Sequence, residues 1–177
     1  MCLTRFLACL GPTEVVKVAG VLLAAGSGSR FAGPSHKLLA GIGGEAVVTH
    51  AARSMVNSGL SGYLLVAGAT ELSPALTEFS ELVVIENPEF EHGIATSLSV
   101  AVDWGEAAGF DALIVGLADQ PGVLSSSWRR LSNSNAPIAV ANYDGLAGNP
   151  VRLEKSVWPL LPRSGDEGAR VLLRTRP

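Results

Sequence analysis

The sequence has few charged residues and no concentration of either sign. Of its 177 residues 16% are charged, and 13 Lys and Arg against 16 Asp and Glu give a formal net charge of −3. Globular chains average about 25% charged residues. Because the chain has no run of Lys or Arg that would neutralise phosphates, we expect no nucleic-acid partner.

Cysteines and long hydrophobic runs are also scarce. Cys2 and Cys9 are the two cysteines, too few for a disulfide scaffold or an all-cysteine metal site. The longest apolar run, residues 18–26, is far shorter than the ~20 residues that a helix needs to cross a bilayer. We therefore expect a cytoplasmic protein without a membrane partner.

The length and the apolar content favour one domain. A chain of 177 residues, 47% of them apolar, can bury a substantial core, and no linker or repeat divides it. The apolar stretch near the start, residues 6–10, is shorter than the roughly 7–15 residues of a signal-peptide core. We expect residues 1–14 to be a disordered leader and residues 15–177 to form a single domain.

Short apolar runs alternate with segments of helical periodicity along the chain. Runs rich in Val, Ile and Leu predict strands buried on both faces of a sheet. Strands that alternate with helices predict an α/β fold, here a three-layer α/β/α, Rossmann-like fold with a mostly parallel central sheet. The predicted strands are 15–24, 63–67, 82–85, 112–117, 138–142 and 150–153, and the predicted helices are 44–58, 73–79, 96–108, 125–131 and 166–174.

Glycine, with 20 residues, is abundant and is concentrated after the first predicted strand. In a parallel sheet ligands bind at the carboxyl ends of the strands, so the loops 25–37, 87–97 and 118–121 are expected to share one edge. Gly26 and Gly28 in the first loop allow a tight turn whose backbone N–H groups point at an anion.

This glycine loop departs from the two common phosphate-binding motifs. The dinucleotide fingerprint requires a small residue where Phe31 stands, and the Walker A motif requires Lys where Pro34 follows Gly33. The loop does carry Arg30, and Lys37 follows it. Both cations can converge on a triphosphate folded over the glycine turn, and the alternative is a flexible turn with two solvated cations.

Residues 21–39, which read VLLAAGSGSRFAGPSHKLL, resemble the signature loop of the molybdenum-cofactor nucleotidyltransferases. Further segments resemble motifs of that family in the same order: 87–98 (NPEFEHGIATSL), 117–121 (LADQP), 148–151 (GNPV) and 165–170 (GDEGAR). The family belongs to a superfamily of Rossmann-like enzymes that transfer a nucleotidyl group from a nucleoside triphosphate (NTP). The resemblance covers residues 18–173 and implies a nucleotidyltransferase domain over 15–177. We expect this domain to lack an Asp-rich final strand and helix that many relatives carry.

The resemblance implies two catalytic cations and a binding surface for the nucleotide. Arg30 would neutralise the β- and γ-phosphates that leave, and Lys37 would lie near the α-phosphate. Gly93, which has no Cβ, would let the base lie close to the chain, with the Thr96 and Ser97 hydroxyls near its edge. The alternative for these two hydroxyls is helix capping. The remaining nucleotide-binding residues implied are Leu23, Ala24, Ala25, Gly26, Ser27 and Gly28.

Asp119 is the predicted metal ligand. It follows a strand and precedes Pro121, and a carboxylate in such a turn can hold Mg²⁺ together with phosphate oxygens and water. The alternative is an ordinary Asp-Pro-type turn. Asn149, which stands where the family commonly has His, and Asp166 are expected to touch the acceptor or to supply a second metal ligand, and the alternative for Asp166 is a helix cap. No metal-ligand spacing relates the histidines His36, His50 and His92.

The reaction implied is attack by an acceptor phosphate on the α-phosphorus of an NTP, with pyrophosphate as the leaving group. Such a reaction needs positioned cations rather than a covalent nucleophile. The pair Ala24-Ala25 resembles the cytidylyltransferase branch of the family, so CTP is the expected donor, Mg²⁺ the cofactor and molybdopterin, a phosphorylated pterin cofactor, the acceptor. The alternatives are GTP or another acceptor, and a non-catalytic nucleotide- or cofactor-binding accessory protein that assists maturation of a molybdoenzyme.

Overall fold

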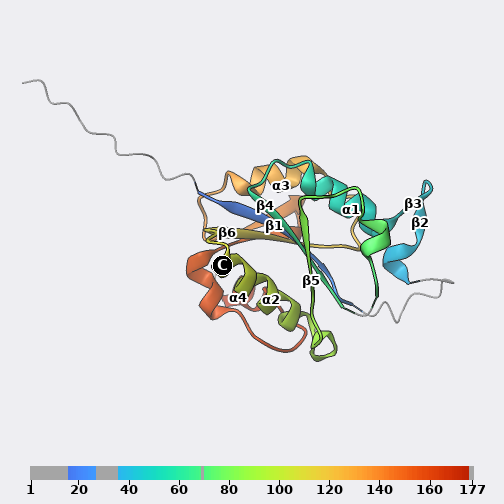
Figure 1. The fold of residues 1–177 in the computed structure, drawn as a ribbon. Coiled ribbons are helices and arrows are strands. Elements are labelled where there is room, and N and C mark those ends of the chain that lie inside the picture. The colour runs from blue at the N-terminus through green and yellow to red at the C-terminus, as the bar shows by residue number, and fades with distance from the viewer. Residues whose placement is uncertain (1–15, 27–35, 69, 176–177) are drawn as a thin grey trace, which may run out of the picture.

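A six-stranded sheet forms the centre of the computed structural model, which describes residues 16–26, 36–68 and 70–175 (Figure 1). Four neighbouring strands are parallel, and the last two complete the sheet in antiparallel pairing. From edge to edge they are β5 (Leu82–Glu86), β4 (Gly62–Ala67), β1 (Val18–Ala24), β6 (Ala112–Leu117), β8 (Leu146–Glu154) and β7 (Ile138–Tyr143). The predicted, mostly parallel sheet is confirmed.

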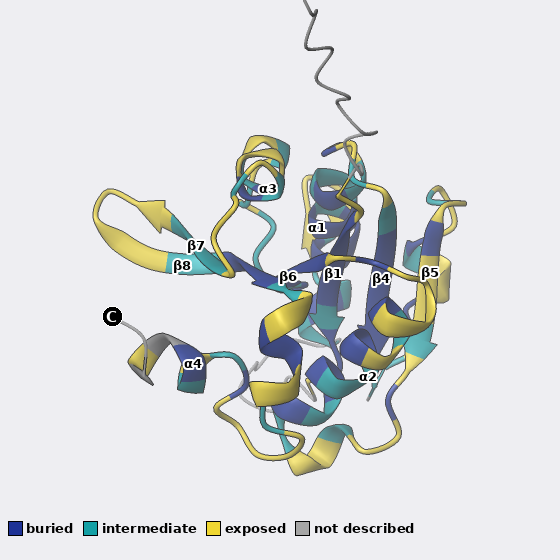
Figure 2. Cartoon of the chain, turned by 90° about the vertical axis from the view of Figure 1, so that its left-hand side faces the viewer, coloured by how far each residue is buried: buried dark blue, intermediate teal, exposed yellow. Residues whose placement is uncertain are grey.

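The central strands are buried on both faces because their side chains alternate between two apolar layers. In β1, Leu22 and Ala24 pack into one layer, and Ala19 and Val21 pack into the other. Figure 2 shows the buried strands β1, β4 and β6 between the helices. The first layer is covered by α1 (Val47–Val56) and α3 (Ser125–Ser132), and the second by α2 (Ile94–Ala107) and α4 (Arg170–Thr175). The three-layer α/β/α prediction is therefore confirmed.

Three predicted helices are shorter than expected. The helix predicted over 44–58 is α1, which begins at Val47 because Glu45 and Ala46 form β3. In place of a helix over 73–79 the chain makes one 3-10 turn, η2 (Ser73–Ala75), and at Leu76 a φ of −119° leaves the helical range. Leu72 precedes this turn as its N-cap, and the Ser73 N–H donates to the Glu71 carboxylate at 2.8 Å. The final helix begins at Arg170 rather than Asp166, because Gly168 takes a positive φ of 50° that interrupts a right-handed helix.

The chain also forms two antiparallel hairpins that the sequence did not predict. The predicted strand 150–153 extends back to Leu146 and pairs with β7 through a turn at Asp144 and Gly145, both with positive φ. Gly43 and Gly44 make a similar turn ahead of α1. The small elements are β2 (Gly41–Ile42), β3 (Glu45–Ala46) and the 3-10 helices η1 (Lys37–Leu39), η3 (Phe90–His92) and η4 (Lys155–Leu160).

The remaining expectations concern the predicted leader and a membrane-spanning helix. The predicted leader, residues 1–14, lies outside the described residues. Among the described helices, none combines the length and the apolar character needed to span a bilayer.

Gly116 in β6 has no side chain, and this leaves room for the buried Trp128 of α3. Trp128 is 1% exposed, and a Cβ placed on Gly116 would lie 2.7 and 3.0 Å from two atoms of its indole ring. Real Cβ atoms do not approach carbon atoms this closely, so the indole and a side chain at position 116 cannot share the space. Gly116 therefore sets the distance between β6 and α3.

We predict that Gly116→Ala lowers the free energy of unfolding by about 1–3 kcal/mol, the usual cost of overpacking a core. Gly122→Ala is the matched control, because a Cβ at position 122 meets no atom within 4 Å. Urea unfolding of the two variants measures the difference. Equal stability of Gly116→Ala and the control would show that α3 moves away from the sheet without cost.

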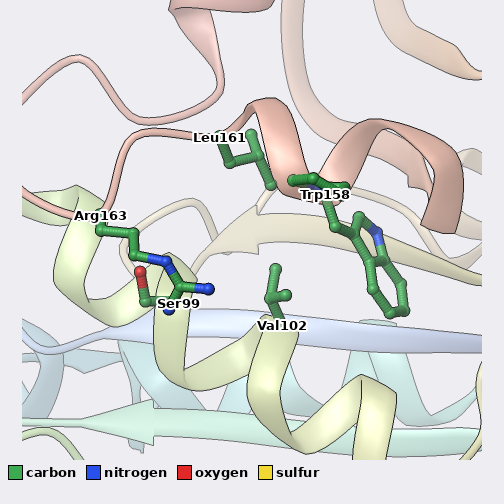
Figure 3. Close-up of a pocket in the computed structure, with 6 residues that line it drawn as sticks. Ser99, Val102, Trp158, Leu161 and Arg163 are labelled. Atoms are coloured by element: carbon green, nitrogen blue, oxygen red, sulfur yellow. The ribbon is translucent and has the colours of Figure 1, made fainter.

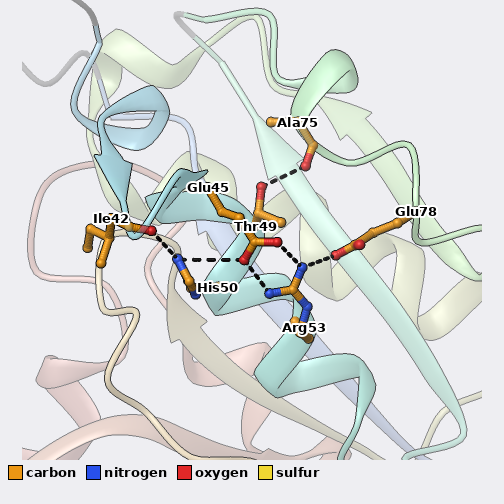
Figure 4. A network of polar contacts seen from close by, with 7 residues as sticks. All are labelled: Ile42, Glu45, Thr49, His50, Arg53, Ala75 and Glu78. Atoms are coloured by element: carbon orange, nitrogen blue, oxygen red, sulfur yellow. Dashed lines mark hydrogen bonds and ion pairs between the residues drawn. The ribbon is translucent and has the colours of Figure 1, made fainter.

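An exposed network of charged side chains joins the β2–β3 hairpin to α1 and to the segment after η2 (Figure 4). The Arg53 guanidinium donates to both carboxylate oxygens of Glu45, at 2.6 and 2.9 Å, and to Glu78 at 2.6 Å. On the same helix His50 donates from Nε2 to the Ile42 carbonyl at 2.9 Å. The hydrogen bonds from Arg53 hold the pKa of Glu45 below its ordinary value of 4.5.

This lowered pKa predicts a pH-dependent contribution to stability. A carboxylate whose pKa is lower in the folded than in the unfolded chain stabilises the fold above the unfolded pKa, and this stabilisation is lost as the pH falls through the folded value. Thermal unfolding should therefore separate wild type from Glu45→Gln at pH 7, and the difference should shrink as the pH falls below the ordinary pKa of Glu45. Glu106→Gln, at an exposed position of α2, is the control and should show no such convergence.

Candidate functional site

The parallel strands of the sheet end at one edge, where backbone hydrogen bonds join the chain segments that leave it. Leu23, near the end of β1, accepts a 3.1 Å bond from the Ala118 N–H directly after β6. Ala67, at the end of β4, accepts a 2.8 Å bond from the Asn87 N–H directly after β5. The predicted loops after β1, β5 and β6 therefore leave from the same edge, where open α/β sheets bind their ligands.

Lys37 and Asp119 form an ion pair at this edge, although 82 positions separate them in the sequence. Lys37 begins η1, and Asp119 stands in the turn after β6. The Lys37 ammonium donates to Asp119 Oδ2, and the two side chains are 42% and 31% exposed. The pair therefore faces solvent on one side, where a charged ligand can reach it.

The second carboxylate oxygen of Asp119 points away from solvent. Oδ1 is buried and has no hydrogen-bond partner among the described residues. A carboxylate with one free oxygen is a suitable ligand for Mg²⁺, which prefers oxygen donors and often keeps only one or two protein carboxylates. In the described parts of the chain, no three His, Cys, Asp or Glu side chains group into a metal site. A metal here would be held by Asp119 and by oxygens from a bound ligand.

The predicted nucleotide-binding backbone is described as far as Gly26. Ala24 and Ala25 are buried, and Gly68 after β4 lies so close to Ala25 that a Cβ on it would come within 2.7 Å. The Gly26 carbonyl accepts a 3.1 Å hydrogen bond from Nε2 of His36. Ser27, Gly28 and Arg30 lie outside the described residues, so their roles stay predictions.

A buried asparagine organises the predicted base-proximal segment. Asn87 is 2% exposed, and its side-chain amide donates to Thr96 Oγ1 and Ser97 Oγ, both at 2.9 Å. Its carbonyl oxygen accepts a 3.0 Å bond from the Glu89 N–H. Both hydroxyls that the sequence suggested for a base accept from Asn87, and Thr96 also borders the open groove beside α2. Neither of them is the N-cap of α2, which is Gly93.

Sequence reasoning assigned no role to Asn87 beyond ending a strand. The signal that marks it is an amide side chain in a turn between a strand and Pro88, since Asn readily bonds the backbone two residues further on. Such an amide has donors left for nearby hydroxyls.

The space beside Gly93 is filled by a distant part of the chain. A Cβ on Gly93, whose φ is +101°, would lie 2.4 Å from the carbonyl of Gly165 and 2.8 Å from Asp166 Oδ1. The Gly165 carbonyl accepts from the Ala95 N–H at 3.0 Å, and the Gly165 N–H donates to His92 at 2.9 Å. Asp166 therefore lies beside the N-terminal end of α2, where a negative charge is favourable, and not at the start of α4.

Asn149, the predicted acceptor contact or second metal ligand, lies near the end of β6. It precedes Pro150 through a cis peptide bond, and its backbone carbonyl accepts a 2.8 Å bond from the Tyr143 hydroxyl. Two residues later Val151 pairs with Val115 of β6, so Asn149 lies toward the carboxyl end of that strand. The structure thus brings Lys37 into contact with Asp119, and groups Thr96, Ser97, Gly93 and Asp166 around Asn87 and the start of α2.

Two hollows lie along α2. A pocket of about 30 Å³ between α2 and the end of η4 is lined by Val102, Trp158 and Arg163 among others and has room for about one water molecule (Figure 3). An open groove of about 580 Å³ runs beside the start of α2 and is bordered by Asn87 and Thr96. The small pocket is too small for a nucleotide, and the groove adjoins the segment that the sequence predicted near the base.

Comparison with known proteins identifies the family. The family model for the MobA-like NTP transferase domain matches residues 20–177. The chain belongs to the MobA-like NTP transferase family. The nicotine blue oxidoreductase of Paenarthrobacter nicotinovorans is 32% identical to this MobA-like chain, over 95% of the chain and 87% of that protein.

Solved structures share the fold of this MobA-like NTP transferase. A nucleotidyl transferase from Methanothermobacter thermautotrophicus superposes with a TM-score of 0.77 at 24% identity, over 90% of this chain and 81% of that one. Rv0371c from Mycobacterium tuberculosis, in complex with manganese, superposes with a TM-score of 0.71 at 23% identity, over 90% and 83% of the two chains. The family resemblance and the nucleotidyltransferase fold predicted from the sequence are confirmed.

We predict that Gly93→Ala destabilises this MobA-like NTP transferase more than Gly109→Ala does. Both glycines have positive φ. At Gly93 a ψ of 168° adds to it and gives a conformation that is essentially restricted to glycine and costs an alanine about 1–3 kcal/mol, and a Cβ at position 109 meets no atom within 4 Å. The additional clash with Gly165 should add about 1–3 kcal/mol, measured by urea unfolding. Equal losses in the two variants would contradict the close contact between Gly93 and Gly165.

Proposed function

We propose that this MobA-like NTP transferase moves a cytidylyl group from CTP to molybdopterin, a phosphorylated pterin cofactor, and releases pyrophosphate. The observation that carries the proposal is the contact of Lys37 with Asp119 at the carboxyl edge of the sheet. Nucleotidyl transfer needs a cation for phosphate charge and a carboxylate for a metal ion at one place. This contact supplies both, and one oxygen of the carboxylate is left over.

The proposed reaction begins with attack of an acceptor phosphate oxygen on the α-phosphorus of CTP. A P–O bond forms to the acceptor, the bond from the α-phosphorus to the oxygen bridging the β-phosphate breaks, and the electron pair leaves with pyrophosphate. Negative charge grows on the leaving group, so a cation fixed beside it lowers the barrier. Lys37 is the proposed cation near the α-phosphate, Arg30 is its proposed partner at the β- and γ-phosphates, and the backbone from Ala24 to Gly28 is the proposed anion cradle.

Mg²⁺ is the proposed cofactor, and the carboxylate of Asp119 would hold it. When bound, the ion neutralises phosphate charge and polarises the phosphorus–oxygen bonds as a Lewis acid. The manganese complex of Rv0371c supports a divalent ion in a protein of this fold. Lys37 orients the Asp119 carboxylate through its contact with Oδ2.

The choice of donor and acceptor follows from the sequence motifs. The pair Ala24-Ala25 supports CTP over GTP, because the guanylyltransferases of this family usually have Ala-Gly there. Asn149, near the end of β6, is a proposed contact of the acceptor. Asp166 is a second, at the start of α2. Molybdopterin is the acceptor that the family resemblance supports, and a molybdoenzyme would be the recipient of the product.

One relative favours a second candidate function. The protein named nicotine blue oxidoreductase, which is 32% identical over 95% of this chain, supports an oxidoreductase activity on the same scaffold. A third possibility is an accessory protein that binds a nucleotide or cofactor without turnover. The three candidates differ in what they release: pyrophosphate, an oxidised electron donor, or nothing.

The test is a nucleotide panel followed by turnover. Calorimetry with CTP, GTP and ATP in Mg²⁺ should show selective binding of CTP, and molybdopterin should then trigger release of pyrophosphate. A preference for GTP would contradict CTP as the donor. Tight binding of a nucleotide without release of pyrophosphate would favour the accessory protein. Oxidation of a nicotinamide dinucleotide without pyrophosphate release would favour the oxidoreductase.

We predict that Asp119→Asn lowers kcat/KM for pyrophosphate release by about 100-fold or more, because a metal contact supplies several kcal/mol of transition-state stabilisation. The same variant should weaken binding of Mn²⁺ in the presence of CTP, measured by electron paramagnetic resonance. Glu106→Gln, an exposed carboxylate on α2, is the control and should leave both measurements unchanged. Full activity of Asp119→Asn would show that Asp119 is not a metal ligand.

A further inference from the structure

One histidine that the sequence left without a role joins the two ends of the first loop. His36 lies between Gly26, the last described residue after β1, and Lys37, the first residue of η1. Its Nε2 lies 3.1 Å from the Gly26 carbonyl oxygen, and its Nδ1 accepts a 3.3 Å hydrogen bond from the Leu38 N–H. The same ring therefore contacts both sides of the proposed phosphate site.

These two contacts assign the protonation of the ring. A nitrogen that accepts from an N–H carries no proton, so Nδ1 is bare and the proton of the neutral ring is on Nε2. Nε2–H then donates to the Gly26 carbonyl, which needs a donor. The Nδ1–H tautomer would place two N–H groups against each other at Leu38 and two acceptors against each other at Gly26.

The segment that follows His36 is held on its other side by the core. Leu38 is 4% exposed and packs into the layer under α1. The His36 carbonyl accepts a 2.8 Å bond from the Leu39 N–H, which closes the 3-10 turn. The backbone of Lys37 is thus fixed between a buried leucine and the His36 ring, while its long side chain reaches Asp119.

We propose that His36 is a positioning residue that fixes the Lys37 turn relative to the Gly26 backbone, an inference that rests on the proposed nucleotidyl transfer. A misplacement of about 1 Å at a reacting centre can lower a rate by about 100-fold. The lysine side chain has four rotatable bonds, so its ammonium can take many positions. A fixed backbone narrows the range of these positions. His36 acts through Lys37 and Gly26 and does not itself touch the reacting atoms.

Two isosteric variants separate this role from simple capping of η1. In His36→Asn the side-chain oxygen takes the place of Nδ1 and can still accept from Leu38, but nothing reaches Gly26. In His36→Gln the terminal amide takes the place of Nε2 and can still donate to Gly26, but the acceptor for Leu38 is lost. A residue that only capped the turn would be replaced by Asn and not by Gln.

The experiment measures kcat and KM for pyrophosphate release, with CTP and molybdopterin, in wild type and in both variants. We expect His36→Asn to lower kcat by about 10- to 100-fold with a smaller change in KM, and His36→Gln to restore most of it. His50→Asn is the matched control, because His50 also donates from Nε2 to a backbone carbonyl, that of Ile42, in the network around Arg53. Its kcat should equal that of wild type.

The opposite ranking, with Asn active and Gln impaired, would reduce His36 to a cap, and equal kcat in all variants would overturn the proposal. An inactive wild type would instead overturn the proposed function. In that case ¹⁵N spectra of the imidazole still decide the contact: the Nε2–H tautomer with a hydrogen-bonded Gly26 carbonyl supports it, and the Nδ1–H tautomer refutes it.

Discussion

The candidate site depends on one constraint, that two chain segments far apart in sequence must leave the sheet side by side. β1 and β6 are neighbouring parallel strands, with Leu23 paired to Leu117, so the chain after each emerges at the same edge. The Lys37–Asp119 ion pair joins the two segments beyond that edge. Because both side chains are partly exposed, the pair adds little to stability. It instead holds an ammonium that would attract a phosphate next to a carboxylate that would attract a metal ion.

The groups around Lys37 and the groups around Asn87 differ in charge and in hydrogen bonding. We call the first set the charged half of the site. Around Lys37 the groups are charged and partly exposed, while Oδ1 of Asp119 is buried without a hydrogen-bond partner among the described residues. Around Asn87 the polar groups are bonded to one another, with Asn87 and Ser97 buried, so they hold the start of α2. A buried polar network of this kind fixes geometry because an unpaired member would be costly. His36 links the charged half to the backbone after β1.

The sequence predicted the sheet because each strand follows from a local pattern, whereas the contact of Lys37 with Asp119 depends on the pairing of β1 with β6. The run 112–117 is bounded by turn residues, and Asp119 lies at a strand end whatever the rest of the chain does. The burial of Ser97 depends on Asn87, and the closeness of Gly93 to Gly165 depends on a loop far downstream. Neither leaves a periodic signal. The direction of β8 was likewise set by its pairing with β6 and β7, which an apolar run alone does not encode.

The bond from the Ala95 N–H to the Gly165 carbonyl has a consequence for the order in which the protein matures during synthesis. Strands β1, β4, β5 and β6 and the residues Lys37 and Asp119 all precede position 120, so the charged half can assemble on a growing chain. The start of α2 obtains its last backbone partner only after the ribosome has passed Gly165. A chain stalled before that point would carry the ion pair but leave the first turn of α2 uncovered, in contact with water.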